Sequence, residues 1–133
     1  MKKSNLFYAQ SGGVTSVINA SACGVIETAR KYKDKIGTVY AGRNGIVGAL
    51  NEELINSIFF FLMFSGALRS TPAGAFGSCR YKLKSYAENR KEYERIMSVF
   101  HAHNIKYFLY NGGGDSQDTA NKLSRLSIEK GFP

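Results

Sequence analysis

Two glycine clusters in this sequence have the composition of anion-binding loops. The first, residues 10–13 (Gln-Ser-Gly-Gly), and the second, residues 111–116 (Asn-Gly-Gly-Gly-Asp-Ser), each follow a short apolar run. Glycine lets a ligand approach the backbone closely, and backbone N–H groups at the start of a helix attract phosphate and other anions. Each cluster taken singly is equally compatible with a tight turn that binds nothing. Neither matches the Walker A or dinucleotide-binding pattern of glycine spacing.

The second cluster contains a carboxylate, Asp115, which limits the ligands that could bind there. It would repel a bound phosphate unless a metal ion or another cation lay between the two groups. A magnesium–phosphate complex is therefore one interpretation. The other is helix capping, since Asp115 and the neighbouring Ser116 are residue types that are favoured at helix N-caps.

A third glycine-rich segment, residues 72–82, ends in a basic cluster. Arg80 lies in this segment, and its planar guanidinium could bond two phosphate oxygens at once. We interpret Arg80 as a candidate anion ligand, with a solvated basic edge as the alternative. For Lys82 and Lys84 the solvated edge is the preferred interpretation.

The pattern of apolar residues predicts alternating strands and helices. Apolar runs indicate strands, and apolar positions at three- and four-residue spacing indicate helices. The expected strands are 6–9, 36–41 and 105–110, and the expected helices are 14–31 (with Val17 facing inward), 87–103 and 117–130. The glycines at 42, 45 and 48 predict a flexible loop. This order is typical of an α/β fold with a mostly parallel sheet flanked by helices, in which ligands bind beyond the carboxyl ends of the strands.

Composition limits the kinds of partner. The 133 residues suffice for one α/β domain or part of one, and the net charge of +8 favours a polyanionic partner. The basic residues form no recognised nucleic-acid motif, and the longest apolar run, residues 58–64, is far shorter than the roughly 20 residues that span a bilayer. We therefore expect no nucleic-acid or membrane partner. Cys23 and Cys79, without a signal-peptide pattern, predict reduced thiols and a cytoplasmic location.

Three segments together resemble the 6-phosphofructokinases: residues 10–20, 77–80 and 110–119. The resemblance covers nearly the whole chain and is closest to the diphosphate-dependent branch. It implies a phosphofructokinase-like α/β fold, with residues 1–133 as the N-terminal part of the donor-binding domain. It also implies magnesium-dependent phosphoryl transfer from diphosphate, in preference to ATP, to fructose 6-phosphate. The product would be fructose 1,6-bisphosphate, in glycolysis, and complete family members are commonly homo-oligomers.

The resemblance also implies roles for individual residues. The implied diphosphate-binding residues are Gly12, which would act through its backbone, Arg80, Gly113, Gly114, Asp115 and Ser116. ATP-using relatives typically have glycine at the position of Asp115, so a carboxylate there implies selectivity for diphosphate. Many members have an aspartate that helps to hold magnesium at the position of Gly114. With glycine at that position, Asp115 is the remaining candidate metal ligand.

Two departures from the family pattern bear on activity. The family's Thr-Ile-Asp-Asn-Asp segment, whose first aspartate acts as base on the sugar hydroxyl, does not occur in this sequence. We therefore expect the isolated chain to be an inactive donor half-site, with a non-catalytic phosphate- or polyanion-binding module as the alternative. The apolar run 58–64 stands where a polar-faced segment is expected, and is compatible with a partner-facing patch, an altered core helix or a locally scrambled reading frame. Together the two departures suggest a truncated or decaying copy, and a deliberately shortened sequence would look the same at the C-terminus.

Overall fold

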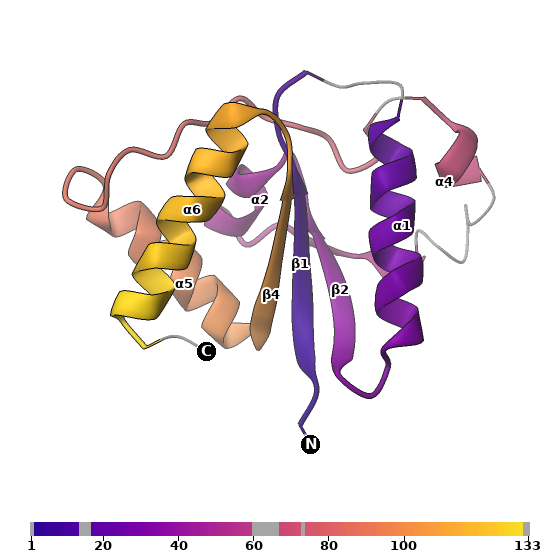
Figure 1. Ribbon diagram of the computed structural model, residues 1–133, viewed down its shortest axis with the longest axis horizontal. Helices are drawn as coiled ribbons and strands as arrows, with labels where there is room; N and C mark the ends of the chain where they lie inside the picture. Colours follow the sequence, from indigo (N-terminus) through magenta and orange to yellow (C-terminus); the bar gives the residue numbers. More distant parts are fainter. Residues whose placement is uncertain (1, 14–16, 60–66, 73, 132–133) are drawn as a thin grey trace.

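A four-stranded sheet forms the centre of the fold (Figure 1). The computed structural model, which describes residues 2–13, 17–59, 67–72 and 74–131, gives the strand order β3-β2-β1-β4. The strands are β1 (Ser4–Gln10), β2 (Ile36–Gly42), β3 (Leu54–Asn56) and β4 (Ile105–Asn111). β1 pairs in parallel with β2 and β4, whereas β3 pairs antiparallel with β2. The predicted α/β fold with a mostly parallel sheet is confirmed.

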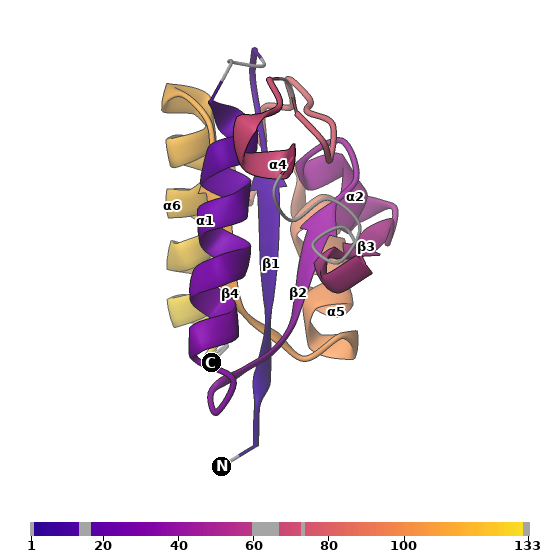
Figure 2. The same cartoon turned by 90° about the vertical axis from the view of Figure 1, so that its right-hand side faces the viewer.

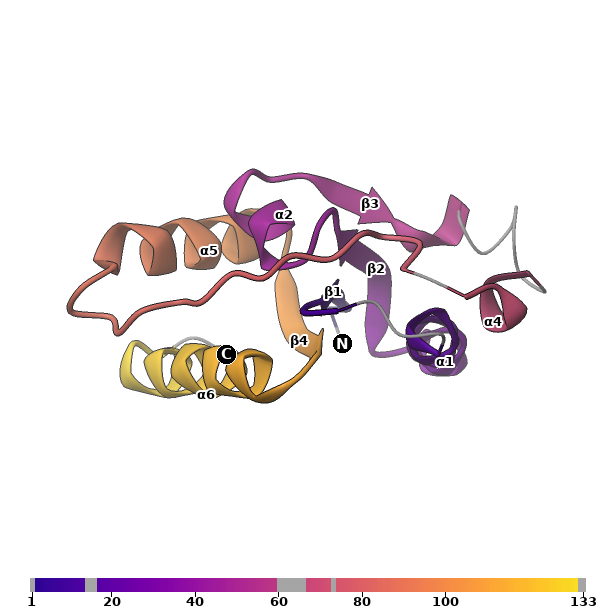
Figure 3. The ribbon, with the colours of Figure 1, turned by 90° about the horizontal axis from the view of Figure 1, so that it is seen from above.

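Helices cover both faces of the sheet. They are α1 (Ile18–Lys31), α2 (Ile46–Leu50), α4 (Ala67–Ser70), α5 (Arg90–Ala102) and α6 (Gly114–Glu129). Seen from above, α1 and α4 lie on one side and α2, α5 and α6 on the other (Figure 3). The side view shows α1 running along the length of β1 (Figure 2).

Alternate side chains of β1 fill two separate cores. Phe7 and Ala9 join the cluster packed against α2, α5 and α6, whereas Leu6 and Tyr8 join the cluster packed against α1. Successive strand residues point to opposite faces, so a strand covered on both faces must be apolar at every position. This explains why the first predicted strand is a continuous apolar run.

Helix α1 begins later than the sequence pattern predicts. The expected helix was 14–31, but α1 starts at Ile18, and residues 14–16 lie outside the described part of the chain. Val17, expected to face inward, is the N-cap residue, has the non-helical angles φ −111° and ψ 0°, and is 63% exposed. The prediction failed because Val17 fits the helical spacing of apolar residues, although its backbone belongs to the turn that precedes α1.

The flexible loop predicted around glycines 42, 45 and 48 is wrong in part. Residues Ile46–Leu50 form α2, and Gly48 is buried within it. A Cβ atom at Gly48 would lie 2.7 Å from the carbonyl oxygen of Arg43, so close packing of two backbone segments requires glycine here. Arg43 and Asn44, between the first two of these glycines, are exposed.

The start of the apolar run 58–64 lies at the surface. Ile58 is 47% exposed and Phe59 is 66% exposed, and residues 60–64 lie outside the described part of the chain. Within the described ranges, no helix combines the length and the apolar character needed to cross a bilayer.

Candidate functional site

The three predicted loops meet at the carboxyl end of the parallel strands. β1 and β4 are adjacent and parallel, so the residues that follow them lie side by side, and the Ser11 N–H donates to the Asn111 carbonyl at 2.8 Å. The third loop joins the first, because Ser11 and Cys79 form an isolated parallel bridge and the Gly12 N–H donates to the Cys79 carbonyl at 3.1 Å. Segments separated by most of the chain therefore form one edge of the molecule.

A cavity of about 460 Å³ opens where the loops meet. Residues 11–13, residues 111–113, Arg80 and the first turn of α1 line it. A larger cavity of about 670 Å³ lies between α5 and α6, but none of the predicted site residues lines it. We place the site in the smaller cavity because glycine backbone and the Arg80 guanidinium converge there, at the carboxyl ends of the parallel strands.

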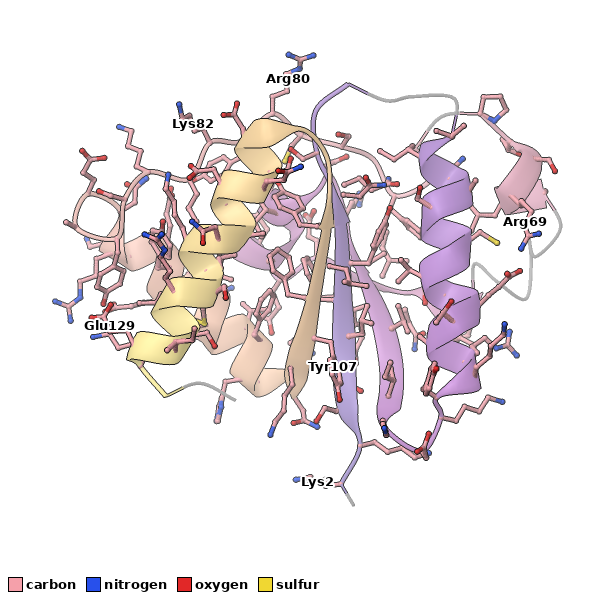
Figure 4. The ribbon with its side chains drawn as sticks, in the orientation of Figure 1. Lys2, Arg69, Arg80, Lys82, Tyr107 and Glu129 are labelled. Carbon is pink, nitrogen blue, oxygen red and sulfur yellow. The ribbon has the colours of Figure 1, made fainter. Side chains whose placement is uncertain are left out.

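The guanidinium group of Arg80 stands beside the first glycine loop. A Cβ atom at Gly13 would lie 3.6 Å from Arg80 Nη2. Arg80 is exposed, and in the part of the chain that the structure describes no carboxylate pairs with it. Figure 4 shows its side chain rising from the edge of the molecule above the loops. A guanidinium group without a carboxylate partner retains its donors for an anion in the cavity.

The second loop leads directly into α6. Gly113 is the N-cap residue, and no side chain caps the helix, so helix capping by Asp115 or Ser116 is wrong. The amides of Gly114 and Asp115 have no backbone acceptor among the described residues, as expected of the first turn of a helix. These amides and the helix dipole favour an anion at this end of α6.

The three predicted site residues that follow Gly113 in the sequence lie outside the cavity wall. Gly114, Asp115 and Ser116 do not line the cavity, although they adjoin Gly113, which does. Asp115 is exposed in the first turn of α6, whereas Ser116 is buried, with 3% of its surface exposed, and packs against Gly112. Asp115 is thus placed to meet a ligand that extends beyond the cavity.

Both backbone polar groups of Gly12 have partners within the protein. Its N–H donates to Cys79, and its carbonyl accepts a hydrogen bond of 2.8 Å from Ser78 Oγ. Its φ of +79° lies in the left-handed region, and no atom lies within 4 Å of a Cβ placed there. The space that a side chain at Gly12 would fill is therefore open to the cavity. A direct hydrogen bond from the Gly12 N–H to diphosphate stays a prediction.

Residues that the sequence did not single out support the loops from below. Gln10 is fully buried at the end of β1 and bonds to the third loop, its Nε2 donating to the Gly77 carbonyl at 3.1 Å. Tyr8 accepts a hydrogen bond from Asn111. Burial raises the pKa of the Tyr8 hydroxyl above its usual value, and the Asn111 bond lowers it in part, so Tyr8 stays protonated at neutral pH.

The predicted metal site reduces to one carboxylate. Among the described residues, no three His, Cys, Asp or Glu side chains gather as a metal centre. Magnesium bound together with phosphates commonly takes only one or two carboxylates from the protein, with water and phosphate oxygens as the other ligands. The exposed Asp115 beside the cavity fits that mode of binding.

The sequence profile of the phosphofructokinase family matches residues 5–130. The chain belongs to this family. The family resemblance inferred from residues 10–20, 77–80 and 110–119 is therefore confirmed. A pyrophosphate--fructose 6-phosphate 1-phosphotransferase from Methylococcus capsulatus is 66% identical over 133 residues, which are 100% of this chain and 32% of that protein. The phosphofructokinase chain thus spans about a third of the length of the curated relatives it matches.

Solved structures of phosphofructokinases have the same fold over this region. The pyrophosphate-dependent phosphofructokinase from Marinobacter aquaeolei is 63% identical with a TM-score of 0.88, over 98% of this chain and 31% of that one. The corresponding protein from Nitrosospira multiformis is also 63% identical, with a TM-score of 0.89, over 97% of this chain and 31% of that one. The fold that brings the three loops together in this chain is therefore also the fold of these solved relatives.

Proposed function

We propose that this chain supplies the diphosphate-binding part of a diphosphate-dependent 6-phosphofructokinase. The observation that carries the proposal is the cavity in which Arg80, Gly12 and Gly113 meet beside the N-terminus of α6. The complete reaction would transfer a phosphoryl group from diphosphate to fructose 6-phosphate, giving fructose 1,6-bisphosphate in glycolysis. The relatives named for this reaction, at 66% and 62% identity, support it.

In this proposal the phosphate is held by position and charge. Arg80 would bond two of its oxygens, and the amides at the start of α6 would face a third. Catalysis of phosphoryl transfer depends largely on such positioning and neutralisation of charge. Magnesium would supply further neutralisation, held by Asp115 together with phosphate oxygens.

Asp115 would select diphosphate over ATP. Its carboxylate is exposed at the first turn of α6, next to the cavity wall at Gly113. An ATP molecule with its terminal phosphates in the cavity would have to place another phosphate near this carboxylate, and two anions in contact repel. A diphosphate has no third phosphate to place there, so it keeps the attraction of Arg80 without this repulsion.

The alternative is a phosphate- or polyanion-binding module without catalysis. This function needs only the guanidinium of Arg80 and the glycine backbone that line the cavity. We propose that the isolated chain, which spans about a third of the length of its relatives, binds diphosphate without turning it over. The complete enzyme would act in the cytoplasm as a homo-oligomer, as the family resemblance implies.

Calorimetric titration tests this proposal. We expect the purified chain to bind magnesium diphosphate and not ATP, and Asp115→Gly to gain ATP binding while keeping its fold. Asp118→Gly is a matched control, because Asp118 is an exposed carboxylate one turn further along α6 and does not line the cavity. A folded wild-type chain that gives no heat with diphosphate would overturn the proposal.

A further inference from the structure

A chain of side-chain hydrogen bonds runs beneath the cavity and connects two of its loops. Asn111 Nδ2 donates to the Tyr8 hydroxyl at 3.3 Å, and that hydroxyl donates to Gln10 Oε1 at 3.3 Å. Gln10 Nε2 then donates to the Gly77 carbonyl at 3.1 Å. Each group donates to the next, so the chain runs without interruption from the second glycine loop to the segment that carries Arg80.

The central members of this chain are removed from water. Gln10 has 0% of its surface exposed and Tyr8 has 3%. A buried amide or hydroxyl that loses its partner is not compensated by solvent, so each of these bonds is costly to break. The bonds therefore hold their partners more firmly than surface hydrogen bonds would.

Gly77 is the point at which the Arg80 segment is fixed. Its φ of +72° lies in the left-handed region, and a Cβ there would lie 3.2 Å from Cγ of Asn44. Two residues further along, the Cys79 carbonyl accepts the N–H of Gly12. Gln10 thus holds the start of the segment, and Gly12 holds the residue immediately before Arg80.

We propose that Gln10 is a positioning residue of the phosphate site, which fixes the segment 77–80 so that the Arg80 guanidinium faces the cavity. Gln10 does not line the cavity, so it acts only through Arg80. The part played by Arg80 rests on the proposed function. When the backbone of segment 77–80 is already fixed before binding, less conformational freedom of that segment is lost in the complex.

The chemistry of position 10 explains why glutamine suits this task. The side chain must donate towards Gly77 and accept from Tyr8 at the same time. A primary amide has both a donor and an acceptor at its tip, a carboxylate has acceptors only, and a thioether has no strong group of either kind. Gln10→Met keeps a similar volume and removes both bonds, and Gln10→Leu also removes both bonds with a branched apolar side chain.

The test compares Gln10→Met with Tyr8→Phe. Both variants remove a buried polar group of the same hydrogen-bonded chain, but Tyr8→Phe keeps the bond between Gln10 and Gly77. The first readout is hydrogen exchange of the Gly12 amide in the ligand-free chain, measured relative to the amides of β1. The second is the affinity for magnesium diphosphate by calorimetry.

We expect Gln10→Met to speed Gly12 exchange and to weaken diphosphate binding, each by roughly two- to tenfold. Tyr8→Phe, which keeps the bond between Gln10 and Gly77, should change both readouts clearly less than Gln10→Met does. Equal effects of the two variants, or a wild-type exchange rate in folded Gln10→Met, would overturn the positioning role. If Gln10→Met does not fold, Gln10→Leu takes its place with the same expectations.

The exchange readout separates this inference from the proposed function. If the wild type fails to bind diphosphate, the proposed function is wrong, and exchange at Gly12 still decides whether Gln10 holds the segment. If the wild type binds and Gln10→Met binds equally well, the proposed function stands and the role of Gln10 is refuted.

Discussion

Replacement of Gly112 by alanine should destabilise the protein because the added methyl group would overlap the first turn of α6 and crowd the first glycine loop. A Cβ atom at this position would lie 2.8 Å from the Cβ of Ser116 and 3.1 Å from the Cβ of Ser11. Carbon atoms in contact normally keep about 3.5–4.0 Å. Because a Cβ atom cannot rotate away from its own backbone, one of the loops has to shift, and overpacking of this kind costs about 1–3 kcal/mol.

The measurement is urea unfolding of Gly112→Ala with Gly114→Ala as the control. Gly114 is the first residue of α6, and a Cβ there meets no atom within 4 Å. Alanine should therefore leave stability unchanged or raise it by up to about 1 kcal/mol, because it is the better helix former. A Gly112→Ala protein as stable as Gly114→Ala would refute the close packing of Gly112 against Ser116 and Ser11.

Three further predictions concern the scaffold. Burial and the hydrogen bond to Glu92 raise the pKa of Tyr81 above 10, so stability should hold below about pH 10, where the unfolded tyrosine titrates, and fall above it. Tyr81→Phe should make that fall shallower in pH-dependent thermal unfolding. Gly48→Ala should destabilise by about 1–3 kcal/mol in urea, because its Cβ would meet the backbone of Arg43. Leu123→Ala should cost about 2–5 kcal/mol by the same measurement, since only 3% of Leu123 is exposed.

The sequence predicted the parallel part of the fold because that part has strong local signals. The run around Phe7 is apolar at consecutive positions, as a buried parallel strand requires, and the runs around Phe7 and Phe108 are each followed by glycines. β3 was missed because its three residues are too short for a recognisable pattern. Gly48 was misassigned because its need for glycine arises from the nearby backbone of Arg43, a contact that spacing along the chain does not reveal.

That several of the predicted site residues lie together was predictable, because they stand at the ends of parallel strands. Gly12, Arg80 and Gly113 do line one cavity, as their positions after parallel strands and in a glycine-rich segment suggested. Gln10 and Tyr8 were not identified, because a polar residue after an apolar run is typical of a turn, and a tyrosine within the run is typical of a core. Their hydrogen bonds join residues up to 103 positions apart, so only the assembled fold brings them together.

The central claim is that diphosphate binds between the two glycine loops and Arg80. Its most direct test is titration of the isotope-labelled chain with magnesium diphosphate, followed by the backbone amide signals in NMR spectra. We predict saturable shifts at Gly13, Gly112 and Gly113, and their loss in Arg80→Ala, whose exposed side chain can be removed without unfolding the chain. Shifts that cluster elsewhere, or that persist unchanged in Arg80→Ala, would contradict it.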